Sequence, residues 1–304
     1  MKRTAPFTFI AVLHVMNSLS LFAQTTGTEM KTGGYVQVRY TSDENSIDEF
    51  QVRRARLKCS GDLLKNMSFL ILFDAVSTPI LWKAHIDINY KPWITLRLGQ
   101  FKTPFSNEYL TSSAKLSMID RAQVVSNLST KYDIGLQVSG SFKILSYSLG
   151  VFNGSGKNTS DENDWKDVVG MIVAKPFNEA EMGFSHYRGK SGEERQKKNR
   201  TGIYMATHLG LLSLGGEYIY AEDGSDQRDG WFVQAAYSCF TDFQGLVRYD
   251  TYDPDRDVSD DTSAIIILGL NVFIHNNSKV QINYLLRDDG DHSDALKAQF
   301  QTTF

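Results

Sequence analysis

The chain has 304 residues, with 32 lysines and arginines against 35 aspartates and glutamates, so its formal net charge is −3 at pH 7. This length allows one or two soluble domains or one closed barrel. Without a basic excess there is no electrostatic basis for nucleic-acid binding. Two cysteines, Cys59 and Cys239, and six histidines form no cluster at metal-ligand spacing, so we expect no metal and no cofactor.

The N-terminus predicts a secretory signal. Met1-Lys2-Arg3 is basic, the stretch from Pro6 to Ala23 is largely apolar, and a small residue, Ala23, stands at its end. We expect a signal peptide over residues 1–23 that is cleaved, and a mature chain over 24–304 with a net charge of −5 (30 basic against 35 acidic residues). A retained anchor helix is the alternative, but polar residues interrupt the apolar stretch.

The mature chain consists of short segments in which apolar and polar side chains alternate, most clearly at 81–90. One face of that segment carries Trp82, Ala84, Ile86, Ile88 and Tyr90, and the other carries Lys83, His85, Asp87 and Asn89. Successive side chains of a strand point to opposite faces, so the segment has one apolar side and one polar side. Aromatic residues near segment ends, among them Trp82 and Tyr187, predict interfacial girdles.

Sixteen segments follow this pattern, and the connections between them are mostly short at one end and long and polar at the other. The predicted strands are 33–41, 48–60, 66–76, 81–90, 92–100, 131–142, 144–152, 166–175, 180–188, 200–209, 211–220, 230–240, 243–252, 262–274, 278–287 and 296–304. An even strand number with this layout is typical of an outer-membrane barrel whose termini lie on the periplasmic side. We therefore expect an all-β fold: one 16-stranded antiparallel transmembrane β-barrel over 24–304. A soluble β-sandwich also alternates, but it needs no sixteen strands.

The interval Gly99–Ala122 is the longest without alternation, and it follows the fifth strand at the long-loop end. A long, partly basic loop at this position is where a barrel would narrow its own lumen. We expect it to fold inward.

Two stretches resemble the phosphate-selective porin O and P family. One is Phe50–Leu57 (FQVRRARL), and the other is Leu98–Ser106 (LGQFKTPFS), which continues to 110–113 and 120–122. The terminal Phe304 resembles the aromatic residue recognised by the barrel-assembly machinery.

The resemblance implies a homotrimeric porin in the outer membrane of a Gram-negative bacterium. Such a porin is surrounded by outer-membrane lipid and passes small hydrophilic solutes passively, with phosphate or other small anions as partners. In that family loop 3, the loop after the fifth strand, folds inward. This chain departs from the family in its short outer loops, which weakens the expectation of high-affinity selectivity.

An anion filter needs cationic side chains that face water within a low-dielectric wall. Arginine suits phosphate because its planar fork donates two parallel hydrogen bonds. The candidate residues for the constriction are Arg53, Arg54, Arg56, Lys58, Arg97, Lys102, Lys115 and Arg121. Arg97, Lys102 and Arg121 are favoured because they flank or lie on the expected constriction. The alternative is that these cations pair with acids such as Asp74, Asp87, Glu108 and Asp120 and only stabilise the barrel.

The parity of the second strand poses a difficulty. Arg54 and Arg56 share one phase with Phe50 and Val52, which look lipid-facing, whereas Arg53 has the other phase. A β-bulge near 53–55 would resolve the conflict by changing the phase. Otherwise the upper part of the strand must stand above the membrane, since a lipid-facing arginine at mid-depth costs about 2–4 kcal/mol.

Three rival functions remain open. A hydrolase would need a serine and a histidine within hydrogen-bond reach, but Ser185 and His186 point to opposite faces, His208 is the one other partner, and no Gly-x-Ser-x-Gly elbow occurs. We therefore expect no enzyme. A non-selective diffusion porin and a non-conducting scaffold barrel are the other two. The mature net charge argues against a strong anion funnel, so we expect a weak to moderate anion preference.

Overall fold

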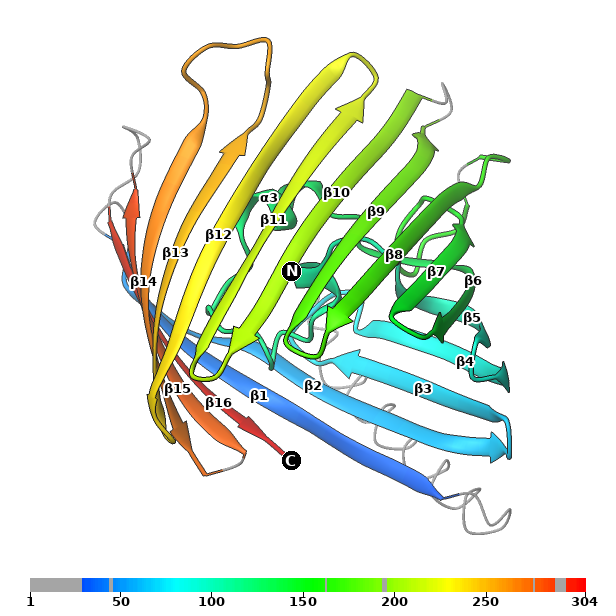
Figure 1. Ribbon diagram of the computed structural model, residues 1–304, viewed down its shortest axis with the longest axis horizontal. Coiled ribbons are helices and arrows are strands. Elements are labelled where there is room, and N and C mark those ends of the chain that lie inside the picture. Colours follow the sequence, from blue (N-terminus) through cyan, green and yellow to red (C-terminus); the bar gives the residue numbers. More distant parts are fainter. Residues whose placement is uncertain (1–28, 44–45, 162, 193–195, 276, 288–293) are drawn as a thin grey trace, which may run out of the picture.

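The computed structural model describes residues 29–43, 46–161, 163–192, 196–275, 277–287 and 294–304. Within these residues, sixteen strands form a closed antiparallel barrel in which each strand pairs with its neighbours in sequence and the last strand pairs with the first (Figure 1). The expected all-β, 16-stranded barrel is thus confirmed. The predicted signal peptide, residues 1–23, lies outside the described residues.

The strands keep close to their predicted positions. They are β1 (Met30–Asp43), β2 (Glu49–Leu64), β3 (Met67–Asp74), β4 (Leu81–Lys91), β5 (Ile94–Lys102), β6 (Tyr132–Phe142), β7 (Leu145–Phe152), β8 (Asp167–Phe177), β9 (Ala180–Ser191), β10 (Gln196–Leu209), β11 (Leu212–Asp223), β12 (Asp226–Phe240), β13 (Phe243–Asp253), β14 (Ser263–Ile274), β15 (Ser278–Arg287) and β16 (Ala295–Thr303).

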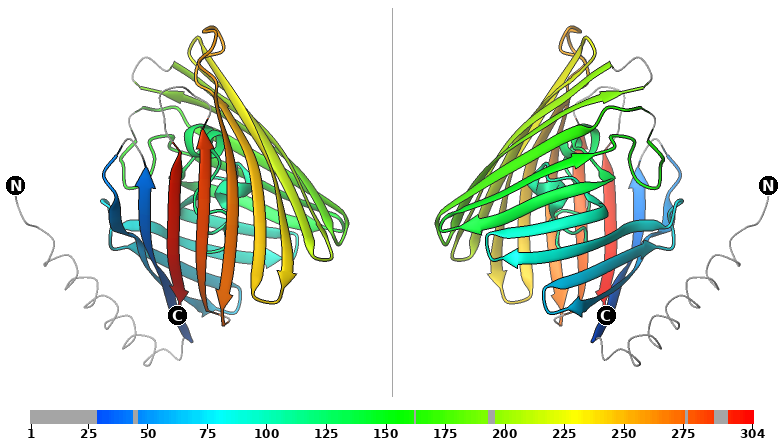
Figure 2. Two further views of the ribbon diagram at one scale, coloured as in Figure 1. Left: turned by 90° about the vertical axis from the view of Figure 1, so that its left-hand side faces the viewer. Right: turned by 90° about the vertical axis from the view of Figure 1, so that its right-hand side faces the viewer.

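The barrel wall is higher on one side, where the long strands β9 to β13 extend beyond their neighbours (Figure 2). β12 has 15 residues, whereas β3 and β7 have eight each. The connection expected at 221–229 is therefore mostly strand. Gly224 takes φ 64°, which lets β11 and β12 join by a tight turn and continue pairing almost to their ends.

The alternation places apolar side chains outside and polar side chains inside. On β15, Ile282 and Tyr284 are 38% and 41% exposed, whereas Gln281 and Asn283 are 1% and 2% exposed. This is the arrangement of a barrel in lipid. Closure follows from the same environment, because an open sheet edge in lipid would leave backbone groups unpaired at several kcal/mol each.

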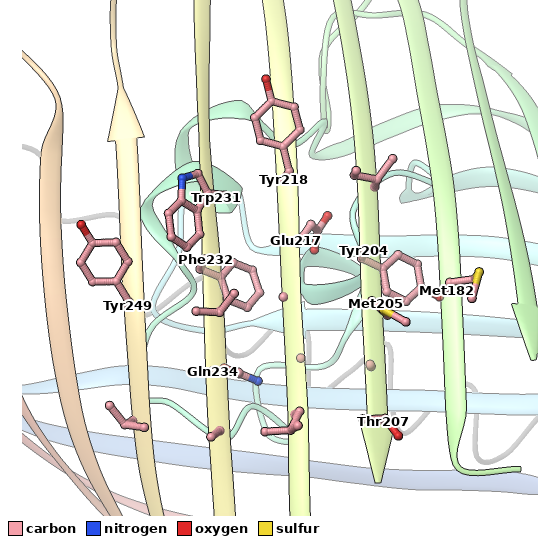
Figure 3. A pocket seen from close by; sticks show the side chains of 18 residues that line it. Met182, Tyr204, Met205, Thr207, Glu217, Tyr218, Trp231, Phe232, Gln234 and Tyr249 are labelled. Carbon is pink, nitrogen blue, oxygen red and sulfur yellow. The ribbon is translucent and has the colours of Figure 1, made fainter. Parts of the chain in front are cut away.

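The outer face of β10 to β13 shows how the wall meets its surroundings (Figure 3). Tyr218, Trp231 and Tyr249 lie on three adjacent strands and are partly exposed outward. Beside them lies an open, mainly apolar depression of about 910 Å³, where Gly216, which has the outward phase, carries no side chain. Aromatic side chains beside an apolar surface match an interfacial girdle. Among the described residues, no helix is long and apolar enough to span a membrane.

A β-bulge resolves the parity conflict on β2. Gln37 of β1 pairs with Arg54 and Val38 pairs with Val52, so Arg53 is the extra residue. Arg54 is therefore buried inside, whereas Val52 is 52% exposed outside. The bulge, one of the two alternatives that the parity left open, is present, and no part of the strand needs to stand above the membrane to explain the pattern.

A second irregularity corrects a prediction about the apolar face of β4. Leu72 pairs with Lys83 and Phe73 with Leu81, so Trp82 is skipped. Its ring lies inside, 4.0 Å from the guanidinium carbon of Arg56. The expectation that Trp82 faces outward is wrong because the bulge reverses its phase. Tyr187 also faces inward, buried, and its hydroxyl bonds to Asp167.

The C-terminal residue closes the barrel against β1. The Phe304 backbone exchanges hydrogen bonds of 2.9 and 3.1 Å with Gly34. Gly34 is needed here, since a Cβ would lie 2.9 Å from the Phe304 ring and 2.2 Å from the Arg56 carbonyl oxygen. Cys59 on β2 and Cys239 on β12 are both free.

The bulge yields a test by deletion. Removing Arg53 deletes the unpaired residue and leaves every inward and outward side chain in phase. Removing Ala55 also eliminates the bulge, but Arg54 then pairs with Val36, whose side chain faces outward. Arg54 would therefore face lipid. We expect the Ala55 deletion to be about 2–4 kcal/mol less stable than the Arg53 deletion, the cost of an arginine in lipid.

Urea unfolding in lipid vesicles, followed by tryptophan fluorescence, measures this difference. Equal stabilities of the two deletion variants would show that the bulge does not set the phase.

Candidate functional site

The loop 3 segment, residues 103–131, joins β5 to β6 and lies within the outline of the barrel (Figures 1 and 2). It contains two short helices that the sequence did not predict, α2 (Asn107–Leu110) and α3 (Gln123–Leu128). Ser106 caps α2 by accepting a hydrogen bond of 3.1 Å from the Tyr109 backbone N–H.

Apolar contacts dock this segment against inward residues of strands between β5 and β16. Phe105, Val124, Val125 and Leu128 are buried in a cluster with Phe101, Phe152, Val169, Tyr187, Ile219 and Phe232. Met118 is buried in a second cluster with inward residues of β12 to β16, which include Leu246, Ile267 and Leu285. Loop 3 covers these inward apolar side chains, so they do not face water.

Polar side chains of β14 to β16 bind the backbone of the same segment. Gln301 donates to the Ala114 carbonyl at 3.1 Å, and Lys279 donates to the Leu116 carbonyl at 2.9 Å. Gln281 and Asn271 donate to the Ser117 carbonyl at 2.8 and 3.0 Å. Because these side chains satisfy loop carbonyls, they fix the course of the segment along this wall.

Two ion pairs add charged anchors. Arg248 of β13 pairs with Glu108, whose other carboxylate oxygen accepts a 2.8 Å hydrogen bond from the Ala122 N–H. Asp120 bridges Arg39 of β1 at 2.8 Å and Lys297 of β16 at 3.0 Å. Burial alone would raise the pKa of Asp120, but these two cations hold it below its usual range. Asp120 therefore stays ionised at neutral pH and keeps the loop attached.

Lys102 and Arg121, two favoured candidates, are occupied by the loop itself. Lys102 donates to the carbonyls of Tyr109, Leu110 and Thr111, the latter two at 3.3 and 3.2 Å. Arg121 donates to the Thr111 carbonyl at 2.7 Å and to the Glu108 carbonyl at 3.2 Å. Both cations donate hydrogen bonds to carbonyl oxygens at the C-terminal end of α2 and so stabilise the conformation of the loop. Lys115 is exposed on the same segment.

Arg97, the third favoured candidate, forms a two-pronged ion pair. Its Nε and Nη2 atoms lie 2.7 and 2.8 Å from the two carboxylate oxygens of Asp87 on β4. This geometry fits the alternative in which the cation pairs with an acid and stabilises the barrel wall. The charge of Arg97 is largely offset, although a third of the side chain remains exposed.

The arginines of β2 lie inside, where the bulge directs them. Arg54 donates to Gln37 at 2.8 Å. Arg56 pairs with Asp74 at 2.8 Å and donates to the Tyr35 hydroxyl at 2.8 Å and to Ser113 of loop 3 at 3.0 Å. Arg53 interacts electrostatically with lumenal groups that include Arg39 and Asp120. Arg56 thus links β1, β2, β3 and loop 3.

A cavity of about 440 Å³ lies between these strands and loop 3. Its cationic lining residues are Lys31, Arg56, Lys58, Lys83 and Lys102, and no aspartate or glutamate stands among the described residues that line it. Arg56 and Lys102 have the partners given above. Within the described part of the chain, no carboxylate pairs with Lys31, Lys58 or Lys83.

The sequence had singled out Lys58, Arg56 and Lys102, and it missed Lys31 and Lys83 as members of this group. Lys83 already stood on the polar face of its strand, which was the available signal. The sequence did not show the strand register, which places Lys58 and Lys83 on either side of Leu72 of β3.

The Glu108–Arg248 pair tests how loop 3 is held. Arg248 is 1% exposed, so Glu108→Gln leaves a buried guanidinium without its counter-charge. We expect a loss of about 3–5 kcal/mol in unfolding free energy and noisier single-channel currents. The double variant Glu108→Gln/Arg248→Met serves as the control. It should lose less than Glu108→Gln alone, because no buried charge is left unpaired. An unaltered stability and current noise in Glu108→Gln would contradict this account.

Comparisons with known proteins agree with this geometry. No curated protein matches the sequence. Among solved structures, the chain is similar to the anion-selective porin from Comamonas acidovorans (12% identity, TM-score 0.72, covering 91% of this chain and 100% of that one). It is also similar to a loop L8 deletion mutant of OmpT, an outer membrane protein of Vibrio cholerae (11% identity, TM-score 0.71, covering 91% and 99%). A third is Salmonella typhi OmpF in complex with daunomycin (10% identity, TM-score 0.71, covering 92% and 99%). At these identities the likeness shows the fold.

The family model for phosphate-selective porin O and P matches residues 30–190, which is 161 of the 304 residues. This range includes both stretches that resembled the family, from the bulged strand β2 through loop 3. The chain therefore belongs to the phosphate-selective porin O and P family and is an outer-membrane porin.

Proposed function

We propose that this porin passes small hydrophilic solutes by passive diffusion and prefers anions, phosphate among them. The observation that supports the preference is the 440 Å³ cavity, because Lys31, Lys58 and Lys83 face it without a carboxylate partner. Cations on a low-dielectric wall concentrate anions from the surrounding water. The family and the fold point to a channel rather than an enzyme.

The expected preference is weak to moderate. Asp74, Asp87 and Asp120 offset the charges of Arg56, Arg97 and Arg39, so the arginines nearest to loop 3 attract a solute less than their number suggests. The lysines that have no carboxylate partner contribute the remaining positive potential. A non-selective diffusion porin is the second candidate, and the observation that favours it is this offsetting of the arginines.

Other parts of the proposal concern export and assembly. Residues 1–23 direct export, Phe304 serves as the signal for the barrel-assembly machinery, and the barrels associate as a homotrimer in the outer membrane of a Gram-negative bacterium. OmpT of Vibrio cholerae, which has the same fold, has been solved in a trimer form. The pairing of Phe304 with Gly34 supports the assembly role, since the last residue reaches the closing seam.

A hydrolase has little support in the geometry. Ser185 is buried inside, whereas His186 bonds outward to Thr201 at 3.1 Å. His208 bonds to Ser213 at 2.9 Å on an adjacent strand, and both are exposed or half-exposed near the short turn. No described acid bonds to either histidine, so the third member of a catalytic triad is missing from the described residues.

Charge reversal in the cavity tests the anion preference. In planar bilayers with a KCl gradient, the wild-type reversal potential should show a chloride-to-potassium permeability ratio above one. Two unit charges about 10 Å apart interact by about 0.4 kcal/mol in water. Reversing two lysines changes four unit charges, which disfavours chloride and favours potassium by about 1.6 kcal/mol each. Screening over one Debye length reduces the sum to about 1.2 kcal/mol, so the ratio should fall by roughly tenfold. The variant is Lys58→Glu/Lys83→Glu.

The matched control is Lys143→Glu, which reverses an exposed charge on the β6–β7 turn, away from the cavity. It should leave the permeability ratio nearly unchanged. A cation-preferring wild type, or a double variant that behaves like the control, would rule out the anion preference. The absence of any channel would favour the scaffold barrel.

A further inference from the structure

Two leucines face the cationic cavity from β3. Leu72 pairs directly with Lys58 of β2 and with Lys83 of β4, and Leu70 pairs with His85 of β4. Paired residues of a sheet project to the same face. Since Lys58 and Lys83 line the cavity, Leu70 and Leu72 face it as well, and both are among its lining residues.

This placement departs from the pattern of the rest of the chain. Elsewhere a leucine on the inward face lies under the loop 3 segment, as Leu246 and Leu285 do in the cluster of Met118. Leu70 and Leu72 belong to neither buried cluster and are only partly buried. Two apolar side chains thus remain accessible in a part of the barrel interior that is expected to be polar.

The loop contributes a third apolar group. Leu110, the last residue of α2, lines the same cavity and is partly exposed. Its place is fixed by Lys102, which binds the Leu110 carbonyl at 3.3 Å, and by Arg121, which binds the adjacent Thr111 carbonyl. The cations that the sequence assigned to the solute therefore hold an apolar side chain at the cavity.

The register sets charge beside apolar surface at close range. Directly opposed residues of neighbouring strands have Cβ atoms about 4.5–5.5 Å apart. Three directly opposed residues on β2, β3 and β4 are therefore Lys58, Leu72 and Lys83. A carboxylate or phosphate held by either ammonium would place the rest of its molecule against Leu72. Chloride and inorganic phosphate have no group that could use this surface.

We propose that the cavity bounded by Lys58, Lys83, Leu70, Leu72 and Leu110 prefers anions that carry a small apolar group, such as short-chain fatty acids and aromatic carboxylates, over inorganic anions. This inference rests on the proposed anion preference and names its substrate class. A cavity of about 440 Å³ accommodates an anion with a body of several carbons. The binding is weak enough for release, because the apolar contact covers one side of the solute only.

A chain-length series tests the inference on the wild-type channel. Acetate, butanoate, hexanoate and octanoate, added to one side of a planar bilayer in KCl, should reduce the chloride current with half-blocking concentrations that fall about twofold to fourfold per two methylenes. Hexanamide, which lacks the charge, should block far less than hexanoate.

The variant Leu70→Asn/Leu72→Asn should abolish the dependence on chain length and leave the chloride-to-potassium ratio unchanged. The matched control Leu70→Met/Leu72→Met keeps the surface apolar and should retain the dependence. Blockage in the asparagine variant that still depends on chain length would place the apolar contact elsewhere and overturn the inference.

The two proposals fail in distinguishable ways. A wild-type channel that prefers chloride over potassium but is blocked equally by acetate and octanoate would refute the apolar selection alone. A wild-type channel that prefers potassium would refute the anion preference and, with it, the substrate class. The wild-type series decides the question even if the asparagine variant does not fold.

Discussion

Backbone pairing in lipid is the constraint on which this structure depends. Every strand must have two partners, so β16 returns to β1, and the seam is completed by the last residue, Phe304, over Gly34. Closure assigns one face of every strand to lipid and the other to the interior. Each side chain therefore belongs to one side unless the strand contains an extra residue.

The bulges at Arg53 and Trp82 determine which of the neighbouring side chains on β2 and β4 face the interior. The bulge at Arg53 lets an outward Val52 and an inward Arg54 coexist two residues apart, and the one at Trp82 brings an indole ring inside against Arg56. Stacked on Trp82 and paired with Asp74, the Arg56 guanidinium can reach Ser113 of loop 3. Departures from regular pairing thus connect the wall to the loop that occupies the lumen.

Local pattern was enough to predict the sixteen strands and the place of the long loop, because both follow from alternation along one segment. It offered the bulge on β2 as one of two alternatives. The bulge at Trp82 was not predictable in this way, since the residues around it alternate without a break. Nor could the partners of the cations be assigned. Arg97 meets Asp87 on the next strand, but Lys102 and Arg121 meet carbonyl oxygens at the C-terminal end of α2, a helix that the sequence did not predict. Such contacts depend on tertiary structure.

The same reasoning explains why net charge is a poor guide to a channel of this kind. Arg248, Lys279 and Lys297 hold loop 3 against β13, β15 and β16, and their charges meet a carboxylate or a carbonyl. Much of the acid lies in outer connections such as 253–261. Lys58 and Lys83 have no carboxylate partner among the described residues and stand beside Leu72 on β2 to β4. Under the proposed function, these three neighbouring strands, and not the net charge of the chain, select the solute.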